Sequence, residues 1–489
     1  MTECDREAVE AAVRALRRFA REKISDRAIE RRGAIPRELL TELAELGAFG
    51  LSLPAEYGGA GMSLAAATEV VAALAESDRS VATSVGLHLG LGSRGLVAFG
   101  TESQKARWLP GLASGATIAA FAATEPNAGS DLAAIATTLV EDAGSLRLSG
   151  QKAYVTNGGF AGVYTVLARS PGLGGAQRGH SLVLVDRADE GVEVGAEEHK
   201  LGLRASSTTP IEFDVRVGPE RILGEPGAGM SLAQEVLAFG RTLMSAGCAG
   251  AARTAVARTV DHVSTRKQFG RVLIAHDVVK DQVAKMASES FAIDALVEWA
   301  ASAERESLLG PRSISAKVFA SEACGRVCDL AIQLHGGSGF IEDIGVSILA
   351  RDARVTRIFE GANDVLLQKA AAAWVVAKPR PEDSVTSGSR AKAAELRASL
   401  TEERDAAVEA RGVRLFGDAR AMHGLGALAI WADAVEASAM KADRVGTPYA
   451  AACFEVVLEN ARRALAALRG DSQMEHVEAI VGELRGRVS

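Results

Sequence analysis

The spacing of apolar residues along this chain changes from a helical period to a strand period and then back to a helical period. Up to about residue 120, apolar side chains recur at helical spacing, as in AAVRALRRFA and ELLTELAELGAFG. Short β-rich runs separated by Gly, Pro and Ser then take over, among them SLRLSG, GVYTVLA and HSLVLVD. Helical periods return from residue 231. Because strands and helices do not alternate, this order argues against a doubly wound parallel sheet.

These blocks predict a mostly α, α+β fold with several domains. We expect an N-terminal helical domain over 1–120, a central β domain, barrel or sheet, over 121–230, and a four-helix-bundle domain over 231–378. The proline-containing polar stretch 379–390 is typical of a linker, and helical periods fill a C-terminal extension over 391–489. A chain of 489 residues with 48% hydrophobic content can bury the cores of more than one domain.

Charge and cysteine content exclude several classes of protein. A net charge of -7, with no basic stripe, argues against a nucleic-acid partner. No stretch is long and apolar enough for a transmembrane helix, and the acidic N-terminus is unlike a secretory signal, so we expect a cytoplasmic protein. Five cysteines spread along the chain fit a reducing compartment. No cluster of His and Cys residues in the sequence completes a metal site.

Five short motifs follow one another along the first three quarters of the chain. They are AAFAATEPNAGSD, KAYVTNGG, TRKQFG, QLHGGSGF and RDARVTRIFEGAND. Each alone is weak evidence; TEPNAGS, for example, is by itself an ordinary turn. In this order and with these spacings, over roughly residues 1–378, they resemble the acyl-CoA dehydrogenase family. Within that family the chain is most similar to the very-long-chain branch, which also has a C-terminal helical extension.

The resemblance implies an FAD enzyme of fatty-acid β-oxidation that desaturates an acyl thioester, a long-chain acyl-CoA, between its α and β carbons. It implies that Glu360 takes the α-proton while the β-hydride passes to flavin N5, and that the Glu360 N–H and a flavin ribityl hydroxyl hold the thioester oxygen. Ile358 and Phe359 precede Glu360 and could desolvate its carboxylate, which would raise the pKa. The residues alone leave open a structural acid near a helix N-terminus.

Some members of the family carry the base just before the arginine that corresponds to Arg241. Gly240 stands at that place here, so Glu360 has no rival. The resemblance places Thr124 at the flavin ring edge and Thr156 at flavin N5, and it places Arg266 on the FAD pyrophosphate of a neighbouring subunit. The predicted cofactor residues are Phe121, Thr124, Ser130, Tyr154, Thr156, Arg266, Gln268, Phe269, Gln333, Gly336, Gly337, Ala362 and Asn363. The predicted substrate residues are Ser130, Arg241 and Gly361.

The resemblance also implies partners: an acyl-CoA substrate, electron transfer flavoprotein as the electron acceptor, and a second copy in a homodimer. Two other functions stay open, namely dehydrogenation of a thioester on an acyl carrier protein in a biosynthetic pathway, and a non-catalytic assembly protein. Tyr154 replaces the tryptophan common at its position in the family. The glycines at 86, 90, 92 and 95 indicate either a deep acyl pocket or close helix packing. The extension carries nearly balanced charge, so we expect it to pack on its own protein rather than on a membrane.

Overall fold

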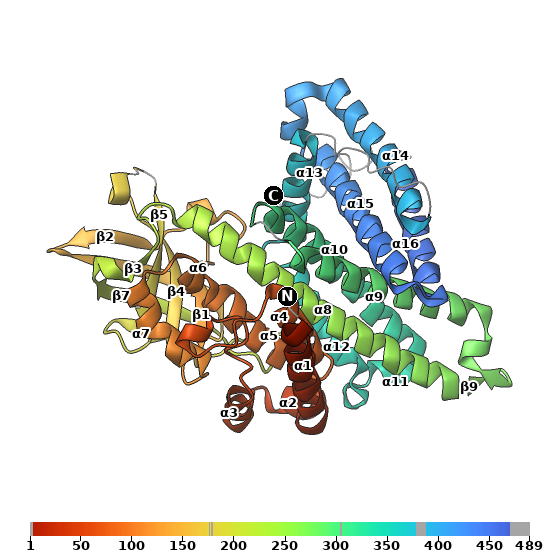
Figure 1. Ribbon diagram of the computed structural model, residues 1–489, viewed down its shortest axis with the longest axis horizontal. Coiled ribbons are helices and arrows are strands. Elements are labelled where there is room, and N and C mark those ends of the chain that lie inside the picture. The colour runs from red at the N-terminus through yellow and green to blue at the C-terminus, as the bar shows by residue number, and fades with distance from the viewer. Residues whose placement is uncertain (1–2, 176, 178, 304–305, 378–387, 470–489) are drawn as a thin grey trace, which may run out of the picture. The chain divides into compact units, whose positions relative to one another are not determined.

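The chain forms two compact units, Met1–Leu366 and Leu367–Ser489, and each is described by itself. The computed structural model describes residues 3–175, 177, 179–303, 306–377 and 388–469 (Figure 1). Most of the predicted linker and the last part of the predicted extension, 470–489, lie outside the described residues. The boundaries predicted for the domains stay predictions.

The first unit begins with a set of helices. They are α1 (Glu3–Lys23), α2 (Asp26–Arg32), α3 (Arg37–Glu45), α4 (Leu64–Ala75), α5 (Arg79–Leu87), the π-helical turn η2 (His88–Gly92), α6 (Arg94–Phe99) and α7 (Glu102–Ala113). Of these helices, α2, α4, α5 and α7 start at a side-chain cap. Asp78 caps α5 by accepting a hydrogen bond from Val81 N at 2.8 Å, and Thr101 and Gln104 form a capping box at α7. Such caps satisfy N–H groups that a helix leaves free at its first turn, which fixes where these capped helices begin.

A sheet follows these helices. Its strands are β1 (Ala119–Ala122), β2 (Thr138–Asp142), β3 (Ser145–Thr156), β4 (Val163–Arg169), β5 (His180–Asp186), β6 (Val192–Val194), β7 (Thr208–Val217) and β8 (Ile222–Leu223). They lie in the order β6-β7-β3-β2-β4-β5-β8, and β1 pairs in parallel with β4. In β7, Ile211, Phe213 and Val215 are buried while the residues between them are exposed, which is the period of a strand with one buried face.

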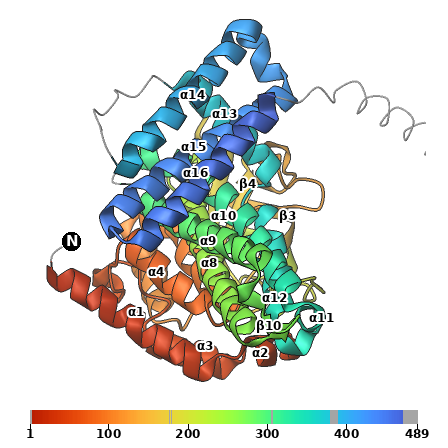
Figure 2. The ribbon, with the colours of Figure 1, turned by 90° about the vertical axis from the view of Figure 1, so that its right-hand side faces the viewer.

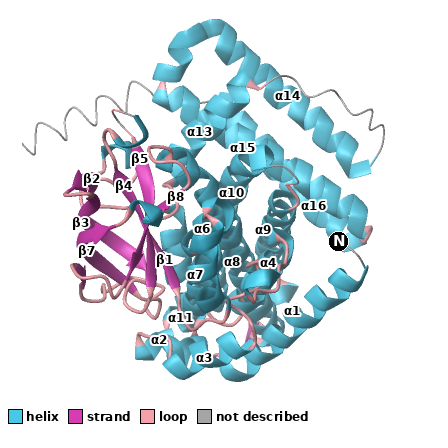
Figure 3. Ribbon diagram, turned by 60° about the vertical axis from the view of Figure 1, so that its left-hand side comes forward, coloured by secondary structure: helices cyan, strands magenta, loops and turns pink. Residues whose placement is uncertain are grey.

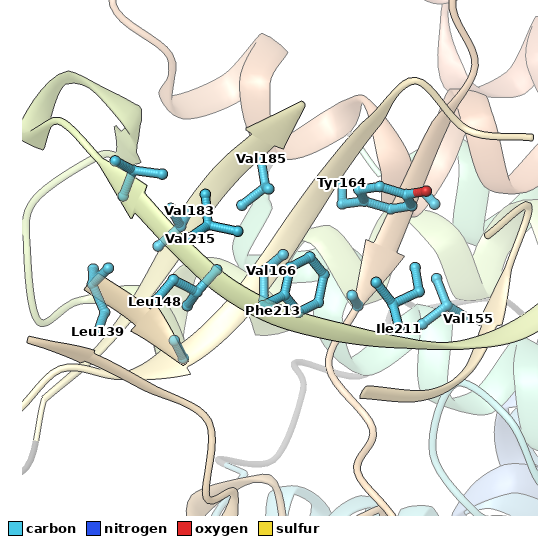
Figure 4. Close-up of a cluster of buried hydrophobic side chains, with 14 of the residues drawn as sticks. Leu139, Leu148, Val155, Tyr164, Val166, Val183, Val185, Ile211, Phe213 and Val215 are labelled. Atoms are coloured by element: carbon cyan, nitrogen blue, oxygen red, sulfur yellow. The ribbon is translucent and has the colours of Figure 1, made fainter. Parts of the chain in front are cut away.

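The core of the sheet is drawn in Figure 4. Tyr164 and Phe213 meet edge to face, with ring centroids 6.1 Å apart, among the buried aliphatic side chains. Strands β4 and β5 are buried along almost their whole length because helices cover their second face. Helices α6 and α8 and the turn η2 pack against this side of the sheet (Figure 3).

Long helices form the rest of the first unit. They are α8 (Gly229–Thr265), α9 (Asp277–Ala301), α10 (Glu306–His335), α11 (Gly337–Phe340), α12 (Val346–Arg354) and the start of α13 (Asn363–Val376), with a hairpin of β9 (Lys267–Gln268) and β10 (Arg271–Val272) between α8 and α9. Helix α8 has 37 residues and therefore spans about 55 Å. It runs from β5, against which Gly229 packs, to the hairpin (Figure 1). The predicted fold class is confirmed.

The second unit is helical. It contains most of α13, then α14 (Gly388–Arg411), α15 (Ala419–Val445) and α16 (Pro448–Arg469), which pack on one another (Figure 2). Leu415, Met422 and Leu425 form a core with Ala371 of α13. Among the described residues, no helix combines the length and the apolar character needed to cross a membrane.

Two glycines of η2 allow a close approach between the turn and its neighbours. A Cβ at Gly90 would lie 3.2 Å from Gly240 Cα on α8, and a Cβ at Gly92 would lie within 2.9 Å of the backbone and Cβ of Ala119 on β1. Neighbouring backbone therefore occupies the space that a side chain would need. At these two positions the structure favours the close-packing interpretation over the deep-pocket interpretation.

We expect Gly92→Ala to lower the free energy of unfolding by about 1–3 kcal/mol, because the added methyl group overpacks a filled site. Gly310→Ala is the matched control, since a Cβ at Gly310 in α10 meets no atom within 4 Å. It should be neutral or slightly stabilising, because alanine favours a helix. Chemical denaturation of both variants measures the difference. An unchanged stability for Gly92→Ala would mean that free space lies beside this glycine.

Candidate active site

Glu360 lies in a tight turn between α12 and α13, and its backbone is strained. Its φ is 56°, in the left-handed region that residues with a side chain rarely adopt. Gly361 follows with a φ of 100°, a conformation that favours glycine. Strain of this kind persists only where the surroundings impose it, and it is concentrated at functional sites.

Glu360 is partly buried, and one oxygen of its carboxylate is shielded from water without a partner among the described residues. Its Oε2 is buried and accepts no hydrogen bond within the described part of the chain. A Cβ at Gly240 would lie 3.3 Å from this oxygen, so the carboxylate lies directly against α8. Burial raises the pKa of Glu360 to about 7, while Arg241 and Lys317 oppose the increase. A carboxyl group with this pKa can act as a proton acceptor near neutral pH.

Two buried cations hold the carbonyl groups of the turn. Arg241 on α8 donates from Nε to Glu360 O at 2.9 Å. Lys317 on α10 donates from Nζ to Gly361 O at 2.7 Å and to Asn363 Oδ1 at 2.7 Å. The described residues give the N–H of Glu360 no acceptor. The turn thus presents an unpartnered carboxylate and an unpartnered N–H while its carbonyl groups face inward.

The predicted residues of the sheet gather where β1 and β3 end side by side. Ala153 N of β3 donates to Thr124 O at 2.9 Å. A bulge in β3 places Tyr154 in the left-handed region, with φ 56°, and leaves it 64% exposed. The side-chain hydroxyl groups of Thr124, Ser130 and Thr156 have no hydrogen-bond partner in the described chain. They are free to bond a ligand at this end of the sheet.

Segment 84–92 joins this end of the sheet to the turn described above. Asn157, which follows β3, donates from Nδ2 to Ser84 O at 3.0 Å and accepts from the Ser84 hydroxyl. At the other end of the segment, Gly90 packs on Gly240, the residue beside the buried carboxylate. The free hydroxyl groups and the carboxylate are therefore fixed relative to each other through buried contacts.

Six further residues predicted to bind the cofactor lie at the end of α8 that is far from Gly240. They are Arg266, Gln268, Phe269, Gln333, Gly336 and Gly337, all of them exposed. His262 of α8 stacks on His335 of α10 with ring centroids 4.4 Å apart, which brings these residues together. Gly240 and Arg266 are 26 positions apart, so about 39 Å of helix separates them. Within one chain the two groups of predicted residues do not meet.

Phe121 is buried in β1, and the Asn363 amide is engaged within its own chain. The sequence patterns did not point to Lys317 or to a buried ion pair between Lys152 and Glu125. In this ion pair Lys152 Nζ lies 2.8 Å from Glu125 Oε1, and it also donates to the carbonyl group of Ala123, which follows β1. Burial lowers the pKa of Lys152 to about 8, and Glu125 opposes this. A single lysine inside an apolar run, as in ISAKVFA, is the signal that would have pointed to Lys317.

Comparison with known proteins matches the chain to three family models. They are the acyl-CoA dehydrogenase N-terminal domain over residues 6–116, the middle domain over 120–215 and the C-terminal domain over 227–374. An acyl-CoA dehydrogenase of Bacillus subtilis (strain 168) is 35% identical over 355 residues, which cover 72% of this chain and 93% of that protein. The chain belongs to the acyl-CoA dehydrogenase family. The predicted family is confirmed.

The mitochondrial very long-chain specific acyl-CoA dehydrogenase of Homo sapiens is another relative of this chain. It is 38% identical over 334 residues, which are 66% of this chain and 51% of that protein, so the chain spans about half the length of that relative. The butyryl-CoA dehydrogenase structure from Megasphaera elsdenii has a TM-score of 0.72 at 31% identity and covers 76% of this chain and 98% of its own. An acyl-CoA dehydrogenase complexed with FAD from Bacillus anthracis shares the fold, with a TM-score of 0.80 at 24% identity over 97% of this chain and 90% of its own.

Proposed function

We propose that this family member uses FAD to remove the α and β hydrogens of an acyl thioester, with Glu360 as the base. The observation that carries the proposal is the buried, unpartnered carboxylate of Glu360 in a strained turn. A non-catalytic assembly protein on the same fold would gain nothing from a desolvated acid or from a strained backbone. Dehydrogenation needs a poorly solvated base, because the α-proton of a thioester is only weakly acidic.

The residues at the end of the sheet fit FAD. The hydroxyl groups of Thr124, Ser130 and Thr156 lack partners in the described chain and can donate to the nitrogen and oxygen atoms at a flavin edge. Tyr154 is exposed beside them and offers an aromatic face. When bound, FAD supplies the acceptor for the hydride that leaves the β carbon. Ala362 and Gly361 lie in the same turn as Glu360 and would complete the site.

The residues of the chain itself provide the acid–base part of the reaction. The Glu360 carboxylate takes the α-proton, and the burial of its Oε2 keeps its basicity high. The Glu360 N–H is available to the thioester oxygen, where negative charge grows as the proton leaves. Arg241 fixes this N–H indirectly, because it holds the carbonyl group of the same residue at 2.9 Å. Base and oxygen-binding donor therefore come from one residue.

We propose a long-chain acyl-CoA as substrate because the chain is 38% identical to a protein named for very long acyl chains. The packing of Gly90 and Gly92 does not add support, since backbone fills the space beside them. For the electron acceptor we propose electron transfer flavoprotein; a structure of 30% identity and TM-score 0.72 is described as that of the electron transferring flavoprotein of Acidaminococcus fermentans. An acyl-carrier-protein thioester is the alternative substrate.

A panel of saturated thioesters tests the substrate. We expect long straight-chain acyl-CoAs to give a higher kcat/KM than short or branched ones, and CoA thioesters to give a higher value than the same acyl groups on acyl carrier protein. The rate of turnover is measured as the reduction of electron transfer flavoprotein under nitrogen. A clear preference for a short branched acyl group would contradict the long-chain proposal. A preference for the carrier protein would favour the biosynthetic alternative.

A further inference from the structure

We propose that Lys317 is a positioning residue for this reaction: its ammonium group clamps the turn that carries Glu360 and supplies positive charge to the base. The inference rests on the proposed function of Glu360. It concerns a residue on a different helix, α10, that lies outside every motif of the sequence and touches neither substrate nor cofactor in the proposed mechanism.

The clamp is built from short bonds in a buried place. The side chain of Lys317 is fully buried, and its Nζ lies 2.7 Å from Gly361 O and 2.7 Å from Asn363 Oδ1. Asn363 is tied to α10 a second time, since its Nδ2 donates to Glu322 Oε1 at 2.7 Å and to Ser321 Oγ at 3.0 Å. Lys317 therefore bridges both sides of the bend that follows Glu360, and α10 holds the whole bend.

The charge on Lys317 needs an explanation beyond packing. No carboxylate oxygen among the described residues lies within 4.0 Å of its Nζ, and a buried cation without an ion pair is costly. A neutral hydrogen-bond donor would hold the two oxygen atoms at lower cost. The lysine is explained if its charge acts on the carboxylate of Glu360. Burial raises the pKa of that carboxylate, and the charge of Lys317 opposes the increase.

The charged and titratable groups around this pair come from two helices. Arg241 and Cys248 on α8 act on both Glu360 and Lys317, and Glu322 on α10 acts on Lys317. Burial lowers the pKa of Lys317 to about 8, while Glu360 opposes the decrease. Lys317 is thus charged at the pH at which Glu360 ionises, and the two groups couple there. Loss of the lysine charge raises the pKa of Glu360 because the carboxylate loses a stabilising cation.

Lys317→Met removes the charge and the donor at nearly constant size. We expect the rate of flavin reduction to fall at least about tenfold with little change in KM, because the base is misplaced rather than the substrate lost. We expect the midpoint of the wild-type pH–rate profile near pH 7, and we expect this variant to move it upward by about one unit. Lys317→Arg keeps the charge and should return the midpoint toward the wild-type value.

Arg326→Met is the matched control. Arg326 is a cation of the same helix, but it pairs with Glu289 at 2.9 Å, away from the turn. Its removal should leave the midpoint unchanged. If Lys317→Met gives the wild-type rate and midpoint, the positioning role is overturned while the function stands. If the wild type itself reduces no flavin, the proposed function fails instead. Should Lys317→Met not fold, Lys317→Gln keeps a donor without charge, and a midpoint equal to that of Lys317→Arg overturns the proposal.

Discussion

Glu360→Gln should bind FAD and acyl-CoA but lose flavin reduction by at least about 100-fold, because an amide cannot accept the α-proton. The two side chains have the same shape, and the inward carbonyl group of residue 360 keeps its bond from Arg241, so the turn should survive. Stopped-flow mixing with acyl-CoA under nitrogen measures the rate, and the spectral shift of bound flavin reports binding separately.

Glu289→Gln is the matched control for this variant. Glu289 is also a buried acid whose pKa burial raises, but it lies on α9 and pairs with Arg326. Its substitution should leave the rate of flavin reduction close to that of the wild type. Near-normal reduction by Glu360→Gln would place the base on another residue. A large loss in both variants would point to general damage by removal of a buried acid.

Arg266→Gln should weaken FAD binding by about 10- to 150-fold, the equivalent of about 1.5–3 kcal/mol for charge-assisted hydrogen bonds to phosphate. The proposal is that Arg266 serves the cofactor of the second subunit, because about 39 Å of α8 separates it from Gly240 beside Glu360. Equilibrium titration of the apoprotein with FAD measures the affinity. Arg271→Gln, on the same exposed hairpin, is the control and should bind FAD normally.

Mixed dimers distinguish a contact between subunits from one within a subunit. If chains with Glu360→Gln are combined with chains carrying Arg266→Gln, each mixed dimer contains one site with an intact base and an intact arginine from the other chain. Activity at limiting FAD should then return in the mixture although both parent dimers lack it. No recovery in mixed dimers of confirmed composition would place Arg266 in the site of its own chain, or outside the site altogether.

The arrangement of helical and strand blocks could be predicted because side-chain periodicity reports directly which face an element buries. The motifs pointed to Glu360, yet its left-handed backbone and its contact with α8 depend on partners far away in sequence. The sequence left a deep pocket and close helix packing both open at Gly90 and Gly92, and only the structure shows that Gly240 and Ala119 approach them. A glycine indicates missing bulk without indicating what takes its place.

The partners of the two buried lysines could not be predicted for a related reason, although the apolar run around Lys317 marks that residue as unusual. Each of Lys317 and Lys152 is a single lysine in its stretch of sequence, so no spacing pattern links it to the carbonyl groups or carboxylate that it binds. Their partners are set by how α10 and β3 pack, which is a tertiary property. In contrast, Thr124 and Thr156 belong to separate motifs, and the hydrogen bond from Ala153 N of β3 to Thr124 O brings these motifs together at one end of the sheet.

Anaerobic mixing of the purified, FAD-loaded protein with a long-chain acyl-CoA shows whether the protein dehydrogenates acyl thioesters. We expect the visible absorbance of the oxidised flavin to bleach within one turnover and the extracted thioester to be the trans-2-enoyl product. Bleaching should become faster as the pH rises through about 7, since Glu360 must be deprotonated to act. A protein that binds FAD and acyl thioesters of all lengths on both carriers, yet never bleaches, would contradict the proposed function.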